Sequence, residues 1–177
     1  MTTLIVDLDH TLIDTDLLYE SSIGALKSKP WLLFMLPFWF GRGKGYLKHK
    51  LVQHFQIDAA KLPYNKTTIN YIKTRKKQGD KAILATASHE FYALAVEKHL
   101  ALFDDVMASN KDFNLSGGNK AGKLVERFGV KGFDYIGDHK RDIPVWEAAN
   151  LAILVNASKS LIKKTQHFNR LILSKKN

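Results

Sequence analysis

Five short apolar runs recur along the chain, each bounded by polar or glycine residues, and they limit the folds available to it. Apolar runs of this length are typical of buried strands. Longer amphipathic stretches separate them, and strands that alternate with helices predict a mostly parallel sheet with right-handed crossovers and helices on both faces. The sequence therefore predicts an α/β fold with about five strands, at residues 3–6, 82–85, 106–108, 133–136 and 151–155.

The stretches between these runs contain signals for the ends of helices. Ser88 can cap a helix that has Leu94 on its apolar face, and Gly129 can end the following helix. Asp142 and Pro144 suit the first turn of a third helix, because proline needs no hydrogen-bond partner for its nitrogen there.

The segment between the first two predicted strands is far longer than one crossover helix requires. Residues 16–78 show helical patterns and no convincing strand. We therefore expect residues 1–15 and 79–177 to form the sheet domain, and residues 16–78 to form a helical insertion above the first strand.

A run of mostly large apolar residues at positions 31–40 lies in the middle of the insertion. It has about half of the ~20 residues that a transmembrane helix needs, and Pro37 interrupts it. Basic residues on both sides, such as Lys29 and Arg42, are typical of an interfacial segment, so peripheral membrane contact through residues 30–44 is one interpretation. The other interpretation, which we favour, is that the run forms the packed core of the insertion.

Charge and cysteine content narrow the classes of function. Lys and Arg number 27 against 17 Asp and Glu, and this excess attracts anionic ligands. We expect a small phosphorylated substrate, which includes a lipid phosphate, and no specific nucleic acid. Part of the excess is surface lysine, and we expect residues 159–176 to form a solvent-facing helix surface. The absence of cysteine excludes thiolate chemistry, and the absence of a visible secretory signal predicts a cytoplasmic or membrane-peripheral location.

Two carboxylates, Asp7 and Asp9, follow the first predicted strand directly. Parallel strands all end at one edge of the sheet, where ligands bind, and residues two apart on an extended chain point the same way. Paired carboxylates repel each other unless a cation lies between them, and oxygen ligands suit a hard ion such as Mg²⁺. One carboxylate could attack phosphorus while the other moves the proton of the leaving group. A strand end followed by an Asp helix cap is the alternative interpretation.

Candidate phosphate ligands occur at two further positions. The hydroxyl of Thr86 and the backbone N–H of Ala87 follow the strand at 82–85 and could hold a phosphate at a helix N-terminus, although simple capping would also explain this pattern. Lys120 begins a helix, where a lysine is unfavourable without a nearby anion, and Lys123 is its rival one turn along.

The segment from Gly137 to Asp142 follows the predicted strand at 133–136. Asp138 can complete a magnesium shell, and Asp142 can orient a ligand, a water or a lysine. Turn formation and helix capping are the alternatives for these two residues. These candidate residues indicate a site when they are taken together, because they follow successive predicted strands in chain order.

Together these residues resemble the motifs of the haloacid dehalogenase (HAD) superfamily over residues 3–156. The matching residues are the Asp-x-Asp-x-Thr of Asp7, Asp9 and Thr11, the strand-ending Thr86, the helix-opening Lys120, and the Gly-Asp-x-x-x-Asp of Gly137, Asp138 and Asp142. The resemblance implies a Rossmann-like core with a helical cap inserted after the first motif.

The resemblance also implies roles for these residues. Asp7 would form an aspartyl-phosphate, and Asp9 would act first as an acid and then as a base. Magnesium would bind Asp7, the Asp9 carbonyl and Asp138, and we include Asp142 in the metal set. Thr86 and Lys120 would hold the phosphate, and we add Thr11 and Ala87 as substrate-binding residues.

A closer likeness is to the HAD domain found ahead of UbiA-type prenyltransferase membrane domains. Asp16-Leu17-Leu18 and Pro30-Trp31-Leu32-Leu33 are among the segments that suggest it. The chain departs from the pattern at His10, which replaces a glycine common in the first motif, and at Ser116, where that subgroup often has lysine.

The leading hypothesis is a magnesium-dependent phosphomonoesterase. A phosphotransferase or mutase of the same superfamily is one alternative. A non-catalytic accessory module of a prenyl-lipid pathway is another.

Overall fold

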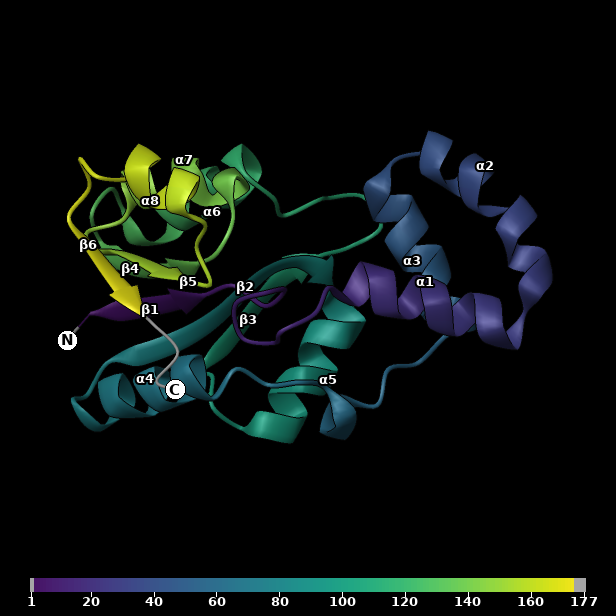
Figure 1. Cartoon of the computed structure of the whole chain (residues 1–177), viewed down its shortest axis with the longest axis horizontal. Helices are drawn as coiled ribbons and strands as arrows, with labels where there is room; N and C mark the ends of the chain where they lie inside the picture. The colour runs from purple at the N-terminus through teal and green to yellow at the C-terminus, as the bar shows by residue number, and fades with distance from the viewer. Residues whose placement is uncertain (1, 174–177) are drawn as a thin grey trace.

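The computed structural model describes residues 2–173, and a six-stranded parallel sheet forms its centre (Figure 1). The strand order is β3-β2-β1-β4-β5-β6, so the direction of the order reverses at β1. Ligands bind at the carboxyl edge of such a sheet, at the point where the order reverses. The strands are β1 (Thr3–Val6), β2 (Lys81–His89), β3 (Asp105–Ser109), β4 (Phe133–Gly137), β5 (Ala152–Val155) and β6 (Arg170–Leu173).

Helices cover both faces of the sheet (Figure 1). Leu4 and Val6 of β1 pack against α4 and α5, whereas Ile5 belongs to the core under α6, α7 and α8. This division follows from the alternation of side chains along a strand. The predicted α/β, Rossmann-like fold is therefore confirmed. These helices are α4 (Lys66–Lys77), α5 (Glu90–Leu100), α6 (Gly118–Phe128), α7 (Ile143–Ala148) and α8 (Lys159–Lys164).

The sixth strand, β6, was not predicted. We expected a helix surface over residues 159–176, but only α8 is helical there, and residues 174–176 lie outside the described residues. β6 pairs with β5 alone and forms the edge of the sheet. Leu171-Ile172-Leu173 is an apolar run as short as the one at 106–108, and Leu171 and Ile172 are 37% and 43% exposed at the edge of the sheet.

The sequence correctly predicted helix ends at two of these positions, and the prediction was wrong at a third. Gly129 follows the last residue of α6, and Pro144 lies in the first turn of α7. Ser88, however, belongs to β2, and His89 caps α5 by accepting the N–H of Phe91 at Nδ1. Strand β2 continues past Thr86 to His89, so α5 begins later than predicted.

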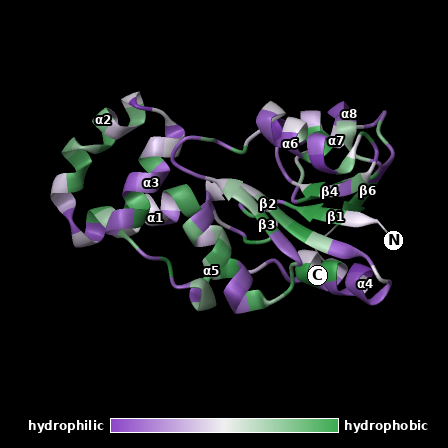
Figure 2. Ribbon diagram, turned by 180° about the vertical axis from the view of Figure 1, so that it is seen from behind, coloured by the Kyte–Doolittle hydropathy of each residue, from purple (hydrophilic) through white to green (hydrophobic). Residues whose placement is uncertain are grey.

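The segment between β1 and β2 contains helices and turns but no strand over residues 17–77. Its first helices form their own core around Leu32, Trp39 and Leu51 and extend beyond the carboxyl edge of the sheet (Figures 1 and 2). α4 packs on the sheet instead, through Ile72. The insertion at 16–78 stays a prediction, and we propose that α4 belongs to the sheet layer. The elements before α4 are α1 (Leu17–Ser28), η1 (Pro30–Phe34), α2 (Leu36–Gly41), α3 (Lys44–His54) and η2 (Ala59–Lys61).

The apolar run at 31–40 contributes to the packed core that we favoured, but only in part. Only Leu32 and Trp39 are buried, because η1 and α2 are short and face α1 and α3 on one side alone. Met35 and Leu36 are partly buried against the same cluster, and five other large side chains are more than half exposed, with Phe34 reaching 84%. Among residues 2–173, no helix has both the length and the apolar character that crossing a membrane requires. The exposed side chains are Trp31, Leu33, Phe34, Phe38 and Phe40.

Candidate active site

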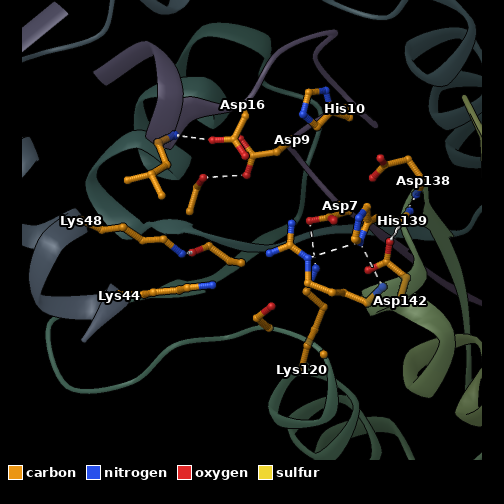
Figure 3. Close-up of a pocket in the computed structure, with 16 residues that line it drawn as sticks. Asp7, Asp9, His10, Asp16, Lys44, Lys48, Lys120, Asp138, His139 and Asp142 are labelled. Atoms are coloured by element: carbon orange, nitrogen blue, oxygen red, sulfur yellow. Dashed lines mark hydrogen bonds and ion pairs between the residues drawn. The ribbon is translucent and has the colours of Figure 1, made fainter. Parts of the chain in front are cut away.

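A cavity of about 100 Å³ opens at the carboxyl edge of the sheet, beside the helices of the insertion (Figure 3). Side chains from the ends of β1, β2 and β4, from the start of α6 and from α3 line it. Six residues predicted for the site line this cavity, namely Asp7, Asp9, Ala87, Lys120, Asp138 and Asp142. The structure thus brings together residues that the sequence separates by up to 135 positions.

Asp7 lies at the centre of the site, immediately after β1. Its backbone N–H donates to the carbonyl of Ile136 at 3.0 Å, which extends the pairing with β4 by one residue. Its Oδ1 accepts the N–H of Leu8 and the Nζ of Lys120, each at 2.9 Å. One carboxylate oxygen is thus held by a cation, and the strand end fixes the position of the group.

Lys120, and not Lys123, is the lysine that enters the site. Lys120 is 2% exposed in the first turn of α6, and its ammonium donates to Asp7 and to the hydroxyl of Tyr135, both at 2.9 Å. Lys123 lies on the outside of α6 and pairs with Glu126 at 2.7 Å. The carboxylate supplies the anion that a lysine at a helix N-terminus needs.

Tyr135 is a site residue that the sequence analysis missed. Its hydroxyl donates to Asp142 at 2.9 Å while accepting from Lys120, so it joins the lysine to the second aspartate. Burial and the charges of Asp142 and Asp7 raise the pKa of Tyr135 well above its ordinary value, so the phenol keeps its proton. The sequence signal that could have identified Tyr135 was its position on β4, two residues before Gly137 and on the same face as Phe133.

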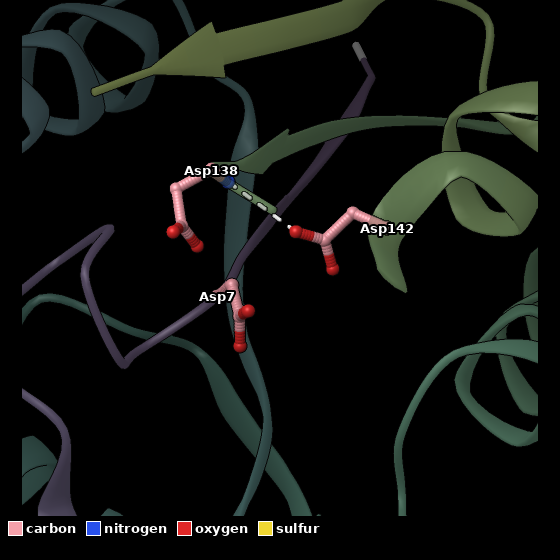
Figure 4. A group of neighbouring side chains, drawn as sticks. All are labelled: Asp7, Asp138 and Asp142. Carbon is pink, nitrogen blue, oxygen red and sulfur yellow. Dashed lines mark hydrogen bonds between the residues drawn. The ribbon is translucent and has the colours of Figure 1, made fainter. Parts of the chain in front are cut away.

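Asp7, Asp138 and Asp142 form a cluster in which one carboxylate oxygen of each lies within 4.8 Å of the others (Figure 4). Burial, and then the charges of Asp142 and Asp7, raise the pKa of Asp138 to about 7. Burial and the charge of Asp7 raise the pKa of Asp142 to about 6. Three converging carboxylates fit a divalent cation, because the cation would offset their repulsion.

Gly137 allows Asp142 to reach this cluster. Asp142 Oδ2 accepts the backbone N–H groups of Asp138 and His139 at 3.3 and 3.0 Å, so it folds back over the end of β4. A Cβ at position 137 would lie 2.6 Å from that oxygen and 2.8 Å from the ring of Tyr135. The glycine of the last motif is therefore a requirement of close packing at this strand end.

The carboxylate of Asp9 is not part of the cluster and faces the insertion. It accepts the backbone N–H of Leu17 at 2.8 Å and the hydroxyl of Ser88 at 2.7 Å. Burial, and then the charge of Asp16, raise the pKa of Asp9 to about 6. A carboxyl with this pKa holds a proton far more readily near neutral pH than an exposed aspartate does, as a general acid must.

Thr11 and Thr86 do not line the cavity, and their predicted contacts with the phosphate stay predictions. Both are fully buried. Thr11 donates its hydroxyl to Asp138 at 3.2 Å, and Thr86 accepts the backbone N–H of Ser88 at 2.9 Å. Strand β2 continues beyond Thr86, so Ala87 and Ser88 reach the cavity in its place.

His10 also lines the cavity, and its backbone explains why this position is unusual. Its φ of 56° lies in the left-handed region that favours glycine. The carbonyl of His10 accepts the side-chain amide of Asn156 at 2.8 Å, and its N–H donates to Thr15 at 3.0 Å. These bonds hold a histidine where the HAD motif commonly has glycine.

Four further charged residues line the cavity without having been predicted. Asp16 caps α1, accepting the N–H groups of its first turn, which is a recognisable sequence signal. Lys44 and Lys48 lie one helical turn apart on α3, and Arg141 lies between β4 and α7. Nothing in the local sequence distinguishes these three cations from the many exposed ones.

Comparisons with known proteins found a matching family model and a relative. Residues 4–147 match the family model described as haloacid dehalogenase-like hydrolase. The uncharacterized protein y4nM of Sinorhizobium fredii is 37% identical over 153 residues, which are 86% of this chain and 29% of that protein. This chain therefore spans less than a third of that relative.

Solved structures share the fold at low sequence identity. A protein of unknown function from Bordetella pertussis Tohama I has a TM-score of 0.75 at 15% identity, with 98% of this chain and 99% of that chain covered. A substrate-bound phosphoserine phosphatase has a TM-score of 0.62 at 17% identity, covering 93% and 90%. A predicted phosphatase from Clostridium acetobutylicum has a TM-score of 0.70 at 17% identity, covering 98% and 94%.

Proposed function

Because this chain belongs to the haloacid dehalogenase-like hydrolase family, we propose that it is a magnesium-dependent phosphohydrolase that acts on small phosphate monoesters. The observation that supports this most directly is the position of Asp7. It lies in a three-carboxylate cluster, one of its oxygens pairs with a buried lysine, and it faces a cavity. A carboxylate held in this way is oriented as a nucleophile, and the lysine offsets the charge of an incoming phosphate.

The residues of the site can carry the bond-making and proton-transfer steps of a two-step hydrolysis. In the first step, a carboxylate oxygen of Asp7 forms a bond to phosphorus while the bond from phosphorus to the ester oxygen breaks. Asp9 donates its proton to that departing oxygen. In the second step, the Asp9 carboxylate accepts a proton from water as the water oxygen attacks phosphorus, which releases phosphate and restores Asp7.

Asp7, Asp138 and the carbonyl of Asp9 would hold Mg²⁺, with Asp142 completing the set. When bound, the cation neutralises charge on the phosphoryl oxygens. Lys120 would bind the same phosphate, and Tyr135 keeps that lysine in place through its hydroxyl. Thr11 positions Asp138 by donating a hydrogen bond to it.

Hydrolysis of p-nitrophenyl phosphate with added Mg²⁺ tests this function. We expect Asp7→Asn to abolish the release of nitrophenol, because an amide is a poor nucleophile. Asp112→Asn is the matched control, since Asp112 is exposed and does not line the cavity. An inert wild-type protein, or equal activity in wild type and Asp7→Asn, would contradict the proposal.

We also propose that the apolar run at 31–40 contacts an anionic membrane surface, which suits a lipid phosphate as substrate. Phe34 and Phe38 are 84% and 59% exposed, and the guanidinium of Arg42 lies 5.0 Å from the ring centre of Phe38. Exposed aromatic side chains beside basic ones match the interface of an anionic bilayer.

Vesicle flotation tests this contact. Wild-type protein should float with vesicles containing phosphatidylglycerol, and a Phe34→Ser/Phe38→Ser variant should not. Val130→Ser is the control, because Val130 is 66% exposed but lies outside the run. Failure of the wild type to float, or equal flotation of the wild type and the double variant, would overturn the membrane assignment.

A further inference from the structure

Three cations line the part of the cavity where the insertion meets the sheet domain. Lys44 and Lys48 project from α3, one helical turn apart, and Figure 3 shows both reaching toward the space in front of Asp7. Arg141 lines the same cavity from the segment between β4 and α7. The cations therefore come from two parts of the chain that are far apart in the sequence.

None of these three cations pairs with a carboxylate within 4 Å in the part of the chain that the structure describes. The nearby carboxylates have other partners. Asp9 accepts from Leu17 and Ser88, and Asp16 caps α1. Lys48 donates instead to the carbonyl of Ala87 and to the side chain of Asn114, so neutral groups orient its ammonium.

Burial and neighbouring charges both act on the ammonium of Lys48. Burial lowers its pKa, the charges of Asp9 and Asp16 raise it, and the charges of Lys44 and Arg141 lower it by a smaller amount. Lys44 is also the first residue of α3, where a cation opposes the helix dipole. A bound anion would relieve both effects.

We propose that Lys44, Lys48 and Arg141 form a second anion subsite, which binds a carboxylate or a further phosphate of the substrate. This inference rests on the proposed function, in which Asp7, Lys120 and the metal engage the phosphate that is hydrolysed. The substrate class is then a phosphate ester with a second anionic group. Because the subsite draws on both α3 and the sheet domain, such a substrate also links the insertion to the catalytic centre.

Binding of two matched ligands tests the subsite. 3-Phosphoglycerate and glycerol 3-phosphate share a carbon skeleton and a phosphate, but only the first has a carboxylate. Titration calorimetry on Asp7→Asn with Mg²⁺ measures their affinities without turnover. We expect 3-phosphoglycerate to bind about 10-fold more tightly or better, as a charged hydrogen-bonded contact provides. Phosphatidylglycerol phosphate in detergent micelles presents two phosphates on a lipid, and its affinity relative to the soluble pair identifies the source of the second anion.

Substitutions of Lys48 and Arg141 test whether these cations cause the preference for 3-phosphoglycerate. In the same background, Lys48→Gln and Arg141→Gln should each reduce the ratio of the two affinities toward one. Lys50→Gln is the control, because Lys50 lies on α3 outside the cavity and contacts Gln53. Equal affinities of the two ligands, or a preference that survives both substitutions, would overturn the subsite. Loss of hydrolysis in the wild type would contradict the proposed function alone, because binding is measured separately.

Discussion

Replacing Asp138 by asparagine should stabilise the metal-free protein and abolish its response to Mg²⁺. Asparagine keeps the side-chain oxygen that accepts the hydroxyl of Thr11 but has no charge. In the wild type, burial and the charges of Asp142 and Asp7 raise the pKa of Asp138 from 3.8 to about 7. This rise corresponds to on the order of 4 kcal/mol of unfavourable free energy for the ionised carboxylate.

The pH dependence follows from the direction of that change. A carboxyl with a higher pKa in the folded state binds more protons when folded, so its stabilising effect is lost as pH rises through about 7. In EDTA at about pH 8, Asp138→Asn should therefore melt higher than wild type by about 10 °C. At about pH 5 the advantage should shrink to less than half, because the wild-type carboxyl is then protonated.

Thermal unfolding followed by circular dichroism, with EDTA or with Mg²⁺, measures both effects. Saturating Mg²⁺ should raise the melting temperature of the wild type and leave that of Asp138→Asn nearly unchanged, because the variant lacks one metal ligand. The reasoning is refuted if Asp138→Asn melts below wild type in EDTA at about pH 8. It is also refuted if Mg²⁺ stabilises the two proteins equally.

Three further substitutions separate the site from the scaffold. Lys120→Met should lower kcat/KM for p-nitrophenyl phosphate by about 100-fold or more, whereas the exposed Lys123→Met should leave it nearly unchanged; similar losses would contradict the assignment of Lys120. Gly137→Ala would place a Cβ 2.6 Å from Asp142, so we expect weaker Mg²⁺ binding by calorimetry and a loss of about 2 kcal/mol in urea unfolding. An unchanged Mg²⁺ affinity would show that Asp142 does not need this close approach. Arg75→Met removes the ion pair with Asp134 of β4, whose side chain is 5% exposed. We expect this variant to lose about 3 kcal/mol of stability while its KM stays constant. A cost below about 1 kcal/mol would argue against that ion pair as a structural element.

The strands could be predicted where burial is continuous. β1 and β4 are buried along their length, so their apolar runs marked them within a residue of their observed ends. β6 was missed because its apolar run has only three residues and lies in a lysine-rich segment, which favoured the interpretation as a solvent-facing helix surface. The apolar run at 31–40 was predicted as packed core but is buried on one side only, and hydropathy alone does not reveal how many sides of a segment are covered.

The sequence by itself determined where Asp7, Lys120 and Asp138 would meet. Each follows a strand or begins a helix, and the topology of a parallel sheet brings those ends to one edge. Local spacing is sufficient for that inference, since it depends only on the order of elements along the chain.

Only the tertiary structure decided what each side chain faces. It directed the carboxylate of Asp9 to the insertion, used Thr11 to hold Asp138, and placed Tyr135 between a lysine and an aspartate. It also brought Lys48 of α3 to a cavity formed by distant strands. These contacts join residues far apart in the chain, and their free energy comes from burial and charge that no local pattern records.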